Sequence, residues 1–369
     1  MKLSKVILRE IGMKMKNPFV TGSGKEDERR LIIVEAHSEQ GIGYGEVSAL
    51  SAPYYTEETT QTSWYVLKEF LLPLAFKEEW DKPVQLAELL EQVRRHHMAK
   101  AGLEGAVWDL YARENNTSLI SLLNGKSRAV PSGVSVGIYP DLDQLVEVVG
   151  DYLELGYQRI KIKIKPGWDK KPLQALREKY GNFPLMVDAN ASYTLADANR
   201  LKRLDRFGLM MIEQPLAQDD IIDHAKLQQV IGTPICLDES IESVAQARKA
   251  IELGSCQIIN IKIARVGGLR QALLIHQLCQ EREVPVWCGG MLESGVGRAH
   301  ALALSSLPGF SLPGDISASA RYWEEDIITP EVTLSEDGYI ELPTGPGLGF
   351  KVKRDLLEEY TVRKEEFVN

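Results

Sequence analysis

The first third of the chain is marked by a change in hydrophobic period. Apolar residues at Val6, Leu8 and Ile11, and again at Leu31, Ile33 and Val34, are followed by Gly41, Gly43 and Gly45, and we interpret them as short strands of an antiparallel meander. Between about residues 59 and 125, apolar residues recur at helical spacing instead. These patterns predict a small α+β domain over residues 1–125.

After Pro131 the chain repeats short apolar runs, each followed by an amphipathic stretch of about 12 to 15 residues. Seven runs start near residues 135, 159, 185, 209, 234, 258 and 285, and a less regular eighth run ends near residues 314–317. Repeated strand–helix units predict a parallel sheet. Eight of them match a closed (β/α)₈ barrel better than an open, doubly wound sheet.

The expected fold is therefore α/β, a modified TIM barrel with a capping domain. We place the barrel at residues 126–321. The tail, residues 322–369, contains no further βα unit. We expect it to return to the N-terminal third, so that residues 1–125 and 322–369 together form the α+β capping domain.

Composition and charge narrow the class of protein. The chain of 369 residues is 44% hydrophobic and 26% charged, which is typical of a globular protein. Its net charge is −9, and its densest basic run, Arg159 to Lys165, alternates with isoleucine as a buried strand does, so nucleic acid is not an expected partner. Four cysteines without CxxC spacing suit a reducing cytoplasm. The chain shows no signal-peptide core and no apolar run of 18 residues, so we expect no membrane partner.

Five ionisable residues stand at the ends of consecutive predicted strands. They are Lys163, Asp188, Glu213, Asp238 and Lys262, separated by 25, 25, 25 and 24 positions. That interval is one βα unit, and the C-terminal ends of barrel strands all open onto one face. We therefore expect these five side chains to converge in one active site.

The three carboxylates of this set predict a divalent-metal site. Any one of them alone could cap a helix or pair with a lysine. On adjacent strands, however, Asp188, Glu213 and Asp238 repel one another and need a cation. Oxygen ligands suit Mg²⁺ (or Mn²⁺), whereas zinc prefers His and Cys, and neither residue stands at these positions.

The lysines of the set predict acid–base chemistry. Lys161 and Lys163 are two positions apart and share one face of a strand, so repulsion and burial should lower one pKa and leave a neutral amine as a base. Lys262 comes from a strand further round the barrel and can approach a substrate from the opposite side. A metal beside two lysines suits removal of a proton α to a carboxylate, because the resulting enediolate carries negative charge on its oxygens. The expected partner is a small-molecule carboxylate.

With these residues in place, the chain resembles the enolase superfamily and, within it, the muconate-lactonizing subgroup, which carries a Lys-x-Lys pair on the second strand and a lysine on the sixth. The motifs that carry the resemblance cover nearly the whole chain and are AGLEGAVWDLYAR, RIKIKIKPGWD, VDANASY, IEQP, LDES, NIKIARVGGL, GGMLESGVGRAH, PGDISAS and GPGLGF. Together they are similar to the o-succinylbenzoate synthase / N-succinylamino acid racemase family.

This resemblance implies two reactions. One is dehydration of a succinyl-hydroxycyclohexadiene carboxylate to o-succinylbenzoate in menaquinone synthesis, with Lys163 taking the α-proton and Lys262 stabilising the enediolate. The other is racemisation of N-acylamino acids, with the two lysines acting as opposed bases. Arg265 matches an arginine that members with racemase activity carry beside the second lysine. The alternative for Arg265 is a solvated residue on the barrel rim.

Further roles are implied by the resemblance alone. They are substrate contacts at Ser135, Lys161, Asn190 and Met291, an indirect role beside the site for Glu239, and closure over the substrate by capping-domain loops that contain Phe19 and Tyr54. A homo-oligomer is also implied. Two other functions remain open at this point. One is another activity of the subgroup, such as a dipeptide epimerase or cycloisomerase, which would differ only in capping-loop contacts. The other is a non-catalytic barrel that binds a ligand.

Overall fold

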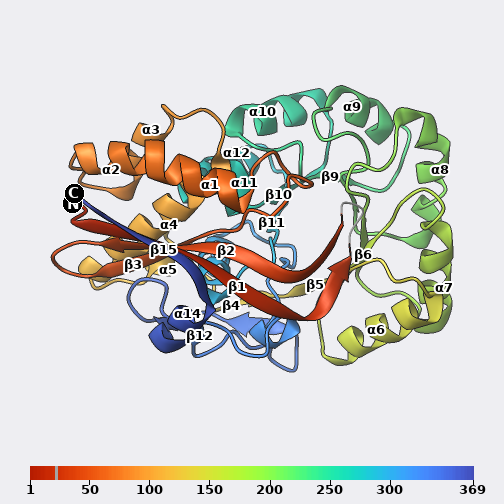
Figure 1. The fold of residues 1–369 in the computed structure, drawn as a ribbon. Coiled ribbons are helices and arrows are strands. Elements are labelled where there is room, and N and C mark those ends of the chain that lie inside the picture. Colours follow the sequence, from red (N-terminus) through yellow and green to blue (C-terminus); the bar gives the residue numbers. More distant parts are fainter. Residues whose placement is uncertain (21–23) are drawn as a thin grey trace.

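The N-terminal strands form one antiparallel sheet with a strand from the tail. In the computed structural model, which describes residues 1–20 and 24–369, β1 (Lys5–Val20), β2 (Lys25–His37) and β3 (Ile42–Val47) pair in sequence order, and β15 (Thr361–Val368) pairs with the other edge of β1. Lys5 pairs with Val368, so the two ends marked in Figure 1 lie together.

Both faces of this sheet are buried, which explains the unbroken apolar run at the centre of β2. Leu31 and Ile33 belong to the large core shared with the barrel, whereas Ile32 and Val34 belong to a second core beneath the capping helices. Those helical segments are α1 (Thr60–Val66), the π-helical η1 (Leu67–Leu71), α2 (Leu72–Lys77), α3 (Pro83–Leu90), α4 (His97–Glu114) and α5 (Leu119–Leu122).

Helix α4 packs directly on β3 because that strand contains two glycines. A Cβ atom at Gly43 would lie 2.2 Å from the carbonyl oxygen of Ala106, and one at Gly45 would lie 2.0 Å from that of Gly102. Any side chain at either position would push the helix away from the sheet. The glycines therefore fix the distance between the capping sheet and its longest helix.

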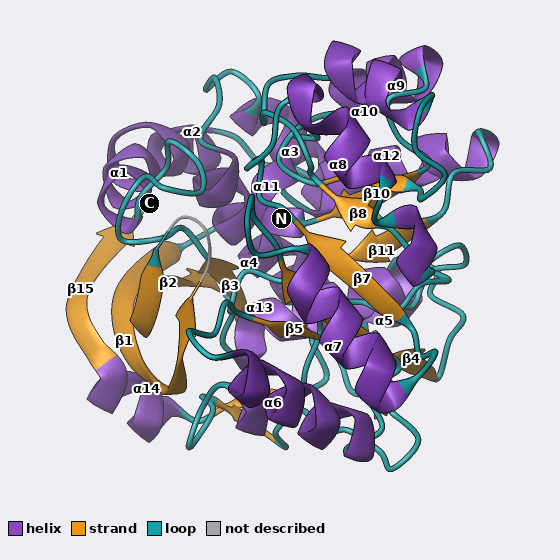
Figure 2. Ribbon diagram, turned by 90° about the vertical axis from the view of Figure 1, so that its right-hand side faces the viewer, coloured by secondary structure: helices purple, strands orange, loops and turns teal. Residues whose placement is uncertain are grey.

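The middle of the chain forms a parallel sheet in which the strands follow sequence order. The strands are β5 (Gly133–Val136), β6 (Arg159–Lys163), β7 (Leu185–Asp188), β8 (Ile212–Glu213), β9 (Ile235–Leu237), β10 (Ile258–Ile261) and β11 (Val286–Cys288). The helices between and after them are α6 (Leu142–Glu154), α7 (Lys170–Tyr180), α8 (Ala198–Lys202), α9 (Ile222–Gln228), α10 (Val244–Leu253), α11 (Ile263–Val266), α12 (Leu269–Glu281) and α13 (Gly295–Ser305). Figure 2 shows helices α6 and α7 lying outside the strands.

The remaining elements are short and irregular. They are β4 (Ala129–Pro131), β12 (Ile328–Thr329), β13 (Tyr339–Glu341), β14 (Lys351–Val352), α14 (Arg354–Tyr360) and the 3₁₀ turns η2 (Leu195–Asp197), η3 (Asp205–Phe207) and η4 (Ser319–Arg321). Strand β13 pairs with β4, and β12 pairs with β14. Elements from the tail therefore lie on both the barrel and the capping sheet.

The eighth strand expected near residues 314–317 is not a regular strand, so that expectation was wrong in detail. The described part of the barrel sheet has seven strands. The segment at Gly314 and Asp315 instead joins the two edges of the sheet, because Gly133 N donates to Gly314 O (2.7 Å) and Asp315 N donates to Cys288 O (2.9 Å). Pro313 and Gly314 interrupt a ladder at this point, and the ring is completed by a few isolated backbone hydrogen bonds, including one from Gly314 N to Pro131 O (3.3 Å).

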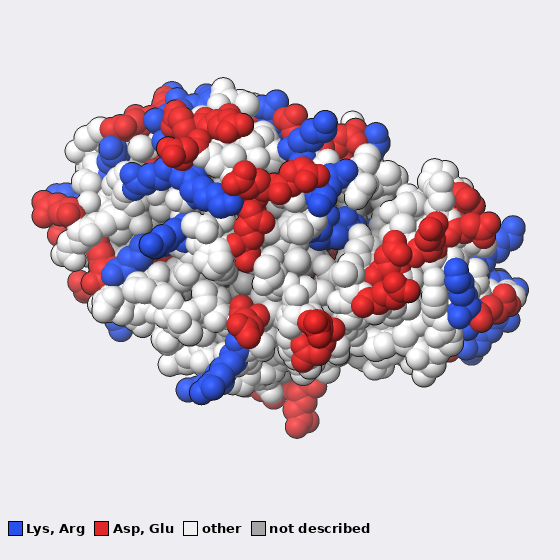
Figure 3. All heavy atoms as spheres, turned by 90° about the horizontal axis from the view of Figure 1, so that it is seen from below, with Lys and Arg blue, Asp and Glu red and all other residues white. Residues whose placement is uncertain are grey.

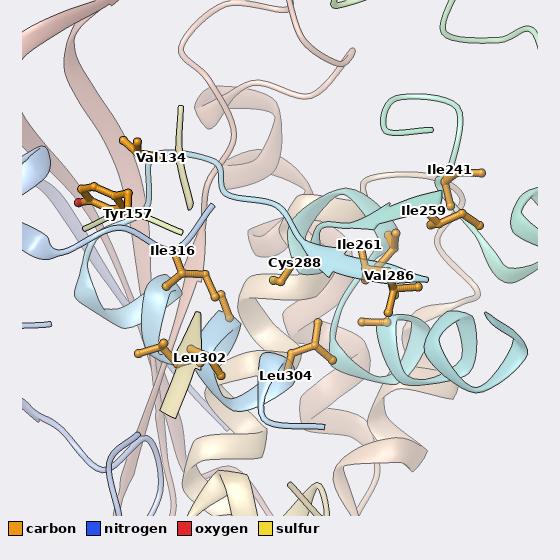
Figure 4. Close-up of a cluster of buried hydrophobic side chains, with 14 of the residues drawn as sticks. Val134, Tyr157, Ile241, Ile259, Ile261, Val286, Cys288, Leu302, Leu304 and Ile316 are labelled. Atoms are coloured by element: carbon orange, nitrogen blue, oxygen red, sulfur yellow. The ribbon is translucent and has the colours of Figure 1, made fainter. Parts of the chain in front are cut away.

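The core confirms the expected fold class, a modified TIM barrel with a capping domain. Ile259, Ile261 and Val286 on β10 and β11 lie in one cluster with Leu302 and Leu304 of α13 (Figure 4). This is the layered arrangement of helix on parallel strand. The boundaries of the two domains remain predictions.

Acidic and basic side chains are interspersed over the face seen in Figure 3. Within the described residues, no helix has the length and apolar character needed to cross a membrane.

Candidate active site

The five strand-end residues converge at one mouth of the barrel. Lys163, Asp188 and Glu213 are the last residues of β6, β7 and β8, and Asp238 and Lys262 directly follow β9 and β10. All five are buried, with exposures of 8%, 1%, 0%, 0% and 7% in that order. They meet because parallel strands of equal register end in one plane, as the 25-residue spacing predicted.

A cavity of about 370 Å³ lies between this mouth and the capping domain. Lys163 and Lys262 both line it, and the strands that carry them are separated by β7, β8 and β9. The two ammonium groups therefore enter the cavity from different sides of the barrel. Tyr55 and Leu50 contribute from the capping loops.

Lys163 is held at the cavity wall by two oxygen acceptors. Its Nζ donates to Asp188 Oδ2 at 2.6 Å and to Asn190 Oδ1 at 2.7 Å. Asn190 in turn donates to Glu239 Oε1 at 2.9 Å. Glu239 is therefore linked to Lys163 through Asn190, and its role in the reaction remains a prediction.

Lys161 lies deeper in the barrel than Lys163 and is surrounded by three carboxylates. Its Nζ is 2.9 Å from Glu213 Oε2, 3.5 Å from Asp188 Oδ2 and 2.5 Å from Asp315 Oδ2. Burial by itself would lower the pKa of Lys161, but the charges of Asp315, Glu213 and Asp188 outweigh it and raise the pKa above its ordinary value. Of the two lysines expected to include one with a lowered pKa, Lys161 is therefore not that one, because three anions surround it.

Lys262 is fixed by a carboxylate and a phenol. Its Nζ lies 2.8 Å from Asp238 Oδ2 and 2.9 Å from the hydroxyl of Tyr55. Burial again works to lower the pKa of this amine, but the neighbouring acidic groups Tyr55, Glu213 and Glu239 raise it above its usual range. In this arrangement the acidic neighbours therefore favour the ammonium form of Lys262.

Arg265 is buried, not solvated on the rim. It is 1% exposed, its Nη1 contacts Asp238 Oδ1 and its Nε donates to Ile241 O at 2.8 Å. It reaches Asp238 from the side opposite the Lys262 contact, since each cation uses a different carboxylate oxygen. The solvated alternative for this residue is excluded.

The three carboxylates fit a divalent cation by donor type. Burial and the nearby charge of Asp188 raise the pKa of Glu213, so added positive charge would be favourable there. In this arrangement each of Asp188, Glu213 and Asp238 contacts a lysine, and within the described residues no three Asp, Glu, His or Cys side chains are grouped as ligands of one ion. The ammonium contacts are those that a bound cation would replace.

The other predicted contacts divide into two groups. Phe19, Tyr54, Asn190 and Met291 line the cavity. Ser135 and Lys161 are not among the described residues that line it. Ser135 Oγ instead donates to Asp315 Oδ2 at 3.0 Å, so this serine acts on the same carboxylate as Lys161.

Three residues of the site were missed by sequence reasoning. Asp315 pairs with Arg159 (2.7 Å) and Lys161, Tyr55 contacts Lys262, and Asn260 Nδ2 donates to Glu213 Oε1 at 2.7 Å. Asn260 stands two residues before Lys262 on the same strand face, a spacing that could have identified it. The loop positions of Tyr55 and Asp315 offer no such period.

Comparison with known families assigns the chain to a class. The model described as "Mandelate racemase / muconate lactonizing enzyme, N-terminal domain" matches residues 4–124, and the model "Enolase C-terminal domain-like" matches residues 144–356. The chain therefore belongs to the mandelate racemase / muconate lactonizing enzyme family of the enolase superfamily.

Individual relatives are similar over nearly their whole length. An o-succinylbenzoate synthase of Geobacillus kaustophilus is 54% identical over 96% of this chain and 95% of its own. An N-succinylamino acid racemase of an Amycolatopsis species is 46% identical over 99% of both chains. The crystal structure of an enolase-superfamily member from Listeria innocua superposes with a TM-score of 0.96 at 41% identity, covering 100% of this chain and 99% of the other.

Proposed function

We propose that the protein is an o-succinylbenzoate synthase, a lyase that depends on a divalent metal, and that it also racemises N-succinylamino acids. The observation that carries the proposal is the pair of buried amines, Lys163 and Lys262, which line one cavity from strands that three other strands separate. The names of relatives that are 46% and 54% identical support both activities.

In the dehydration, Lys163 is the base. As a neutral amine, its Nζ accepts the proton from C1 of the cyclohexadiene carboxylate, and the C–H electrons move into the enediolate. The ammonium of Lys262 lies across the cavity and stabilises the negative oxygens. The C6–O bond then breaks, Lys163 returns its proton to the departing hydroxide, and water and the aromatic product result.

In the racemisation, the two lysines exchange roles. One amine removes the α-proton from one face of the N-succinylamino acid, and the other ammonium delivers a proton to the opposite face. Asn190 and Asp188 hold Lys163, and Tyr55 and Asp238 hold Lys262, so each Nζ is oriented for its own face. A two-sided arrangement of this kind is what inversion of configuration requires.

Asp188, Glu213 and Asp238 would hold the Mg²⁺ (or Mn²⁺), which when bound supplies positive charge beside the enediolate oxygens. Tyr55 links this group to the capping domain, because its hydroxyl lies 3.2 Å from Asp238 Oδ2. Through Tyr55, the capping loop therefore contacts both Asp238 and Lys262 and restricts the position of that lysine.

The proposal is tested by substituting each lysine. Lys163→Ala and Lys262→Ala should each lower the rate of dehydration by about 10²- to 10⁴-fold, the usual contribution of a general acid or base. Lys165→Ala is the matched control, since Lys165 is exposed and only two positions beyond Lys163. Unchanged turnover by Lys163→Ala would contradict the proposal.

Isotope exchange separates the two faces. In deuterium oxide, each single lysine variant should lose racemisation but still exchange the α-proton of one enantiomer of N-succinylphenylglycine, and the two variants should differ in which enantiomer exchanges. A panel that adds dipeptides and muconate covers the related activities of the subgroup. Turnover of dipeptides alone, with neither proposed substrate consumed, would refute this assignment.

A further inference from the structure

A second cavity, of about 490 Å³, lies away from the catalytic mouth, on the seam between the capping domain and the outer face of the barrel. One wall is the segment of the capping domain from Glu91 to Lys100, at the start of α4. The other wall is formed by the beginning of α10 and by the junction of α11 with α12. Neither the acid–base pair nor the three strand-end carboxylates lines it.

Lys100 is the feature of this cavity that needs an explanation. Its side chain is only 8% exposed, yet its Nζ has no hydrogen bond or ion pair with any residue of the described chain. Lysines buried to this extent are normally paired with an anion. The side chain of Lys100 instead lines the cavity, so its ammonium group is accessible to a ligand there. Burial lowers the pKa of Lys100, with only longer-range attraction from Glu91 and Glu58 working against it.

Each acidic side chain of the cavity already accepts a hydrogen bond or forms an ion pair. Glu242 pairs with Arg95, Glu91 accepts from Gln271 Nε2 at 2.8 Å, and Glu104 accepts from Trp108 Nε1 and the backbone N of residue 270, both at 2.8 Å. Glu58 lies outside the cavity and accepts from the first backbone N–H groups of α4.

Two basic side chains of the cavity form no ion pair within the described residues. Like Lys100, the exposed Arg94 has no ion pair within the described residues. Burial lowers the pKa of His97 to about 4, so this ring is neutral at physiological pH. Glu91 is hydrogen-bonded to the neutral amide of Gln271, and burial raises the pKa of Glu104 to about 7. Within the described residues, two cations without an ion pair, Lys100 and Arg94, therefore face one carboxylate without an ion pair, Glu91, and the net unpaired charge is positive.

The backbone is strained just before α4, beside this cavity. Arg95 and His96 have φ angles of 58° and 51°, in the left-handed region that non-glycine residues rarely adopt. The first turn of α10 borders the opposite wall through Ser243 and Gln246, and the N-terminus of a helix favours an anion.

We propose that this cavity is a binding site for a small oxyanion of the phosphate class, with Lys100 and Arg94 as its charge partners. The bound anion joins the capping domain to the two barrel segments that follow the active-site residues. Glu242 comes four residues after Asp238, and Gly267 comes two residues after Arg265. An anion bound here would therefore stabilise the contact between the capping domain and those two segments. This proposal does not depend on which reaction the protein catalyses.

Calorimetric titration with inorganic phosphate at constant ionic strength tests the proposal. The wild-type protein should bind phosphate saturably with a dissociation constant on the order of 1 mM or below, and an equal ionic strength of chloride should give no saturable heat. Lys100→Met, which keeps the length of the buried stem, should weaken binding by about tenfold or more, and Arg94→Gln should weaken it to a smaller extent because its charge is solvated.

Two controls identify the site. Lys249→Met removes an exposed lysine of α10 that does not line the cavity, and it should leave the affinity unchanged. Lys163→Met alters the catalytic cavity instead and should also leave it unchanged. Absence of saturable binding to the wild-type protein overturns the proposal, as does wild-type affinity in Lys100→Met. If Lys100→Met fails to fold, the exposed Arg94→Gln variant decides, and unaltered affinity in it counts against the site.

Discussion

Glu46 joins the capping sheet to the barrel, and its replacement by glutamine should change the pH dependence of stability. The carboxylate is 6% exposed and accepts hydrogen bonds from the backbone N atoms of Ser294 (3.2 Å) and Gly297 (3.1 Å), and from the hydroxyls of Ser48 (2.9 Å) and Ser294. Burial raises the pKa of Glu46 to about 7, and the nearby charge of Glu293 adds to the effect. Glutamine keeps the shape, since its amide oxygen can face Ser294 while its nitrogen donates to Ser48.

The sign of the effect follows from proton linkage. Because the folded-state pKa is higher than the ordinary glutamate value of about 4.5, the folded protein binds this proton more tightly than the unfolded chain. The stabilisation is complete below pH 4.5 and is lost as the pH rises through 7. As the pH rises from 5.5 to 8.5, ionisation of Glu46 should lower the free energy of unfolding of the wild-type protein by about 2 kcal/mol. The Glu46→Gln variant has no group that ionises at this position, so it should lack this decrease.

Urea unfolding of both proteins at pH 5.5, 7 and 8.5, followed by tryptophan fluorescence, measures this difference. Other titrating groups cancel in the comparison, so wild-type stability relative to Glu46→Gln should fall by about 2 kcal/mol across the range. Glu69→Gln, at an exposed position, is the control and should show no such trend. Parallel stability curves for wild type and Glu46→Gln would refute the reasoning that burial raises the pKa of this carboxyl to about 7.

Three further perturbations follow from the structure. Asp315→Asn removes an anion from the buried Lys161, so it should destabilise the fold by about 3 to 5 kcal/mol, visible as a lower calorimetric midpoint; an unchanged midpoint would show that the network is dispensable. Chelation with EDTA should abolish turnover, and Mg²⁺ or Mn²⁺ should restore it while raising the thermal midpoint; full activity in the chelated protein would exclude the metal site. Gly268→Ala would place a Cβ atom 1.5 Å from Glu104 Oε2, so it should cost more than about 2 kcal/mol in denaturant unfolding, whereas Gly181→Ala, which also has a positive φ but no atom within 4 Å of the new Cβ, should cost less.

The parts of the site that repeat with the fold were predictable from the sequence. A βα unit has a nearly constant length, so side chains that recur at that interval occupy equivalent places at the strand ends, as Asp188, Glu213 and Asp238 do. The same argument located both lysines of the acid–base pair. Tight packing of the barrel interior then leaves these side chains little freedom in direction.

The parts of the site that lie on irregular segments were not predictable in the same way. Asp315 closes the barrel from a segment without strand geometry, and its charge is the reason that the pKa of Lys161 rises instead of falling. The capping loop contains adjacent tyrosines, and sequence pattern does not indicate that Tyr55 contacts Lys262 while Tyr54 is 68% exposed. In both cases the missing information is tertiary, because a loop has no period from which direction can be inferred.

The pairing of β1 with β15 has a consequence for how the protein is made. During synthesis β1 to β3 emerge from the ribosome first, but the strand that covers the exposed edge of β1 is translated only after every strand of the barrel. Until then β1 presents unpaired backbone groups to other nascent chains. The capping-domain residues that line the catalytic cavity, such as Phe19 and Tyr55, are translated early, but the sheet beside them is complete only when residues 361–368 have docked.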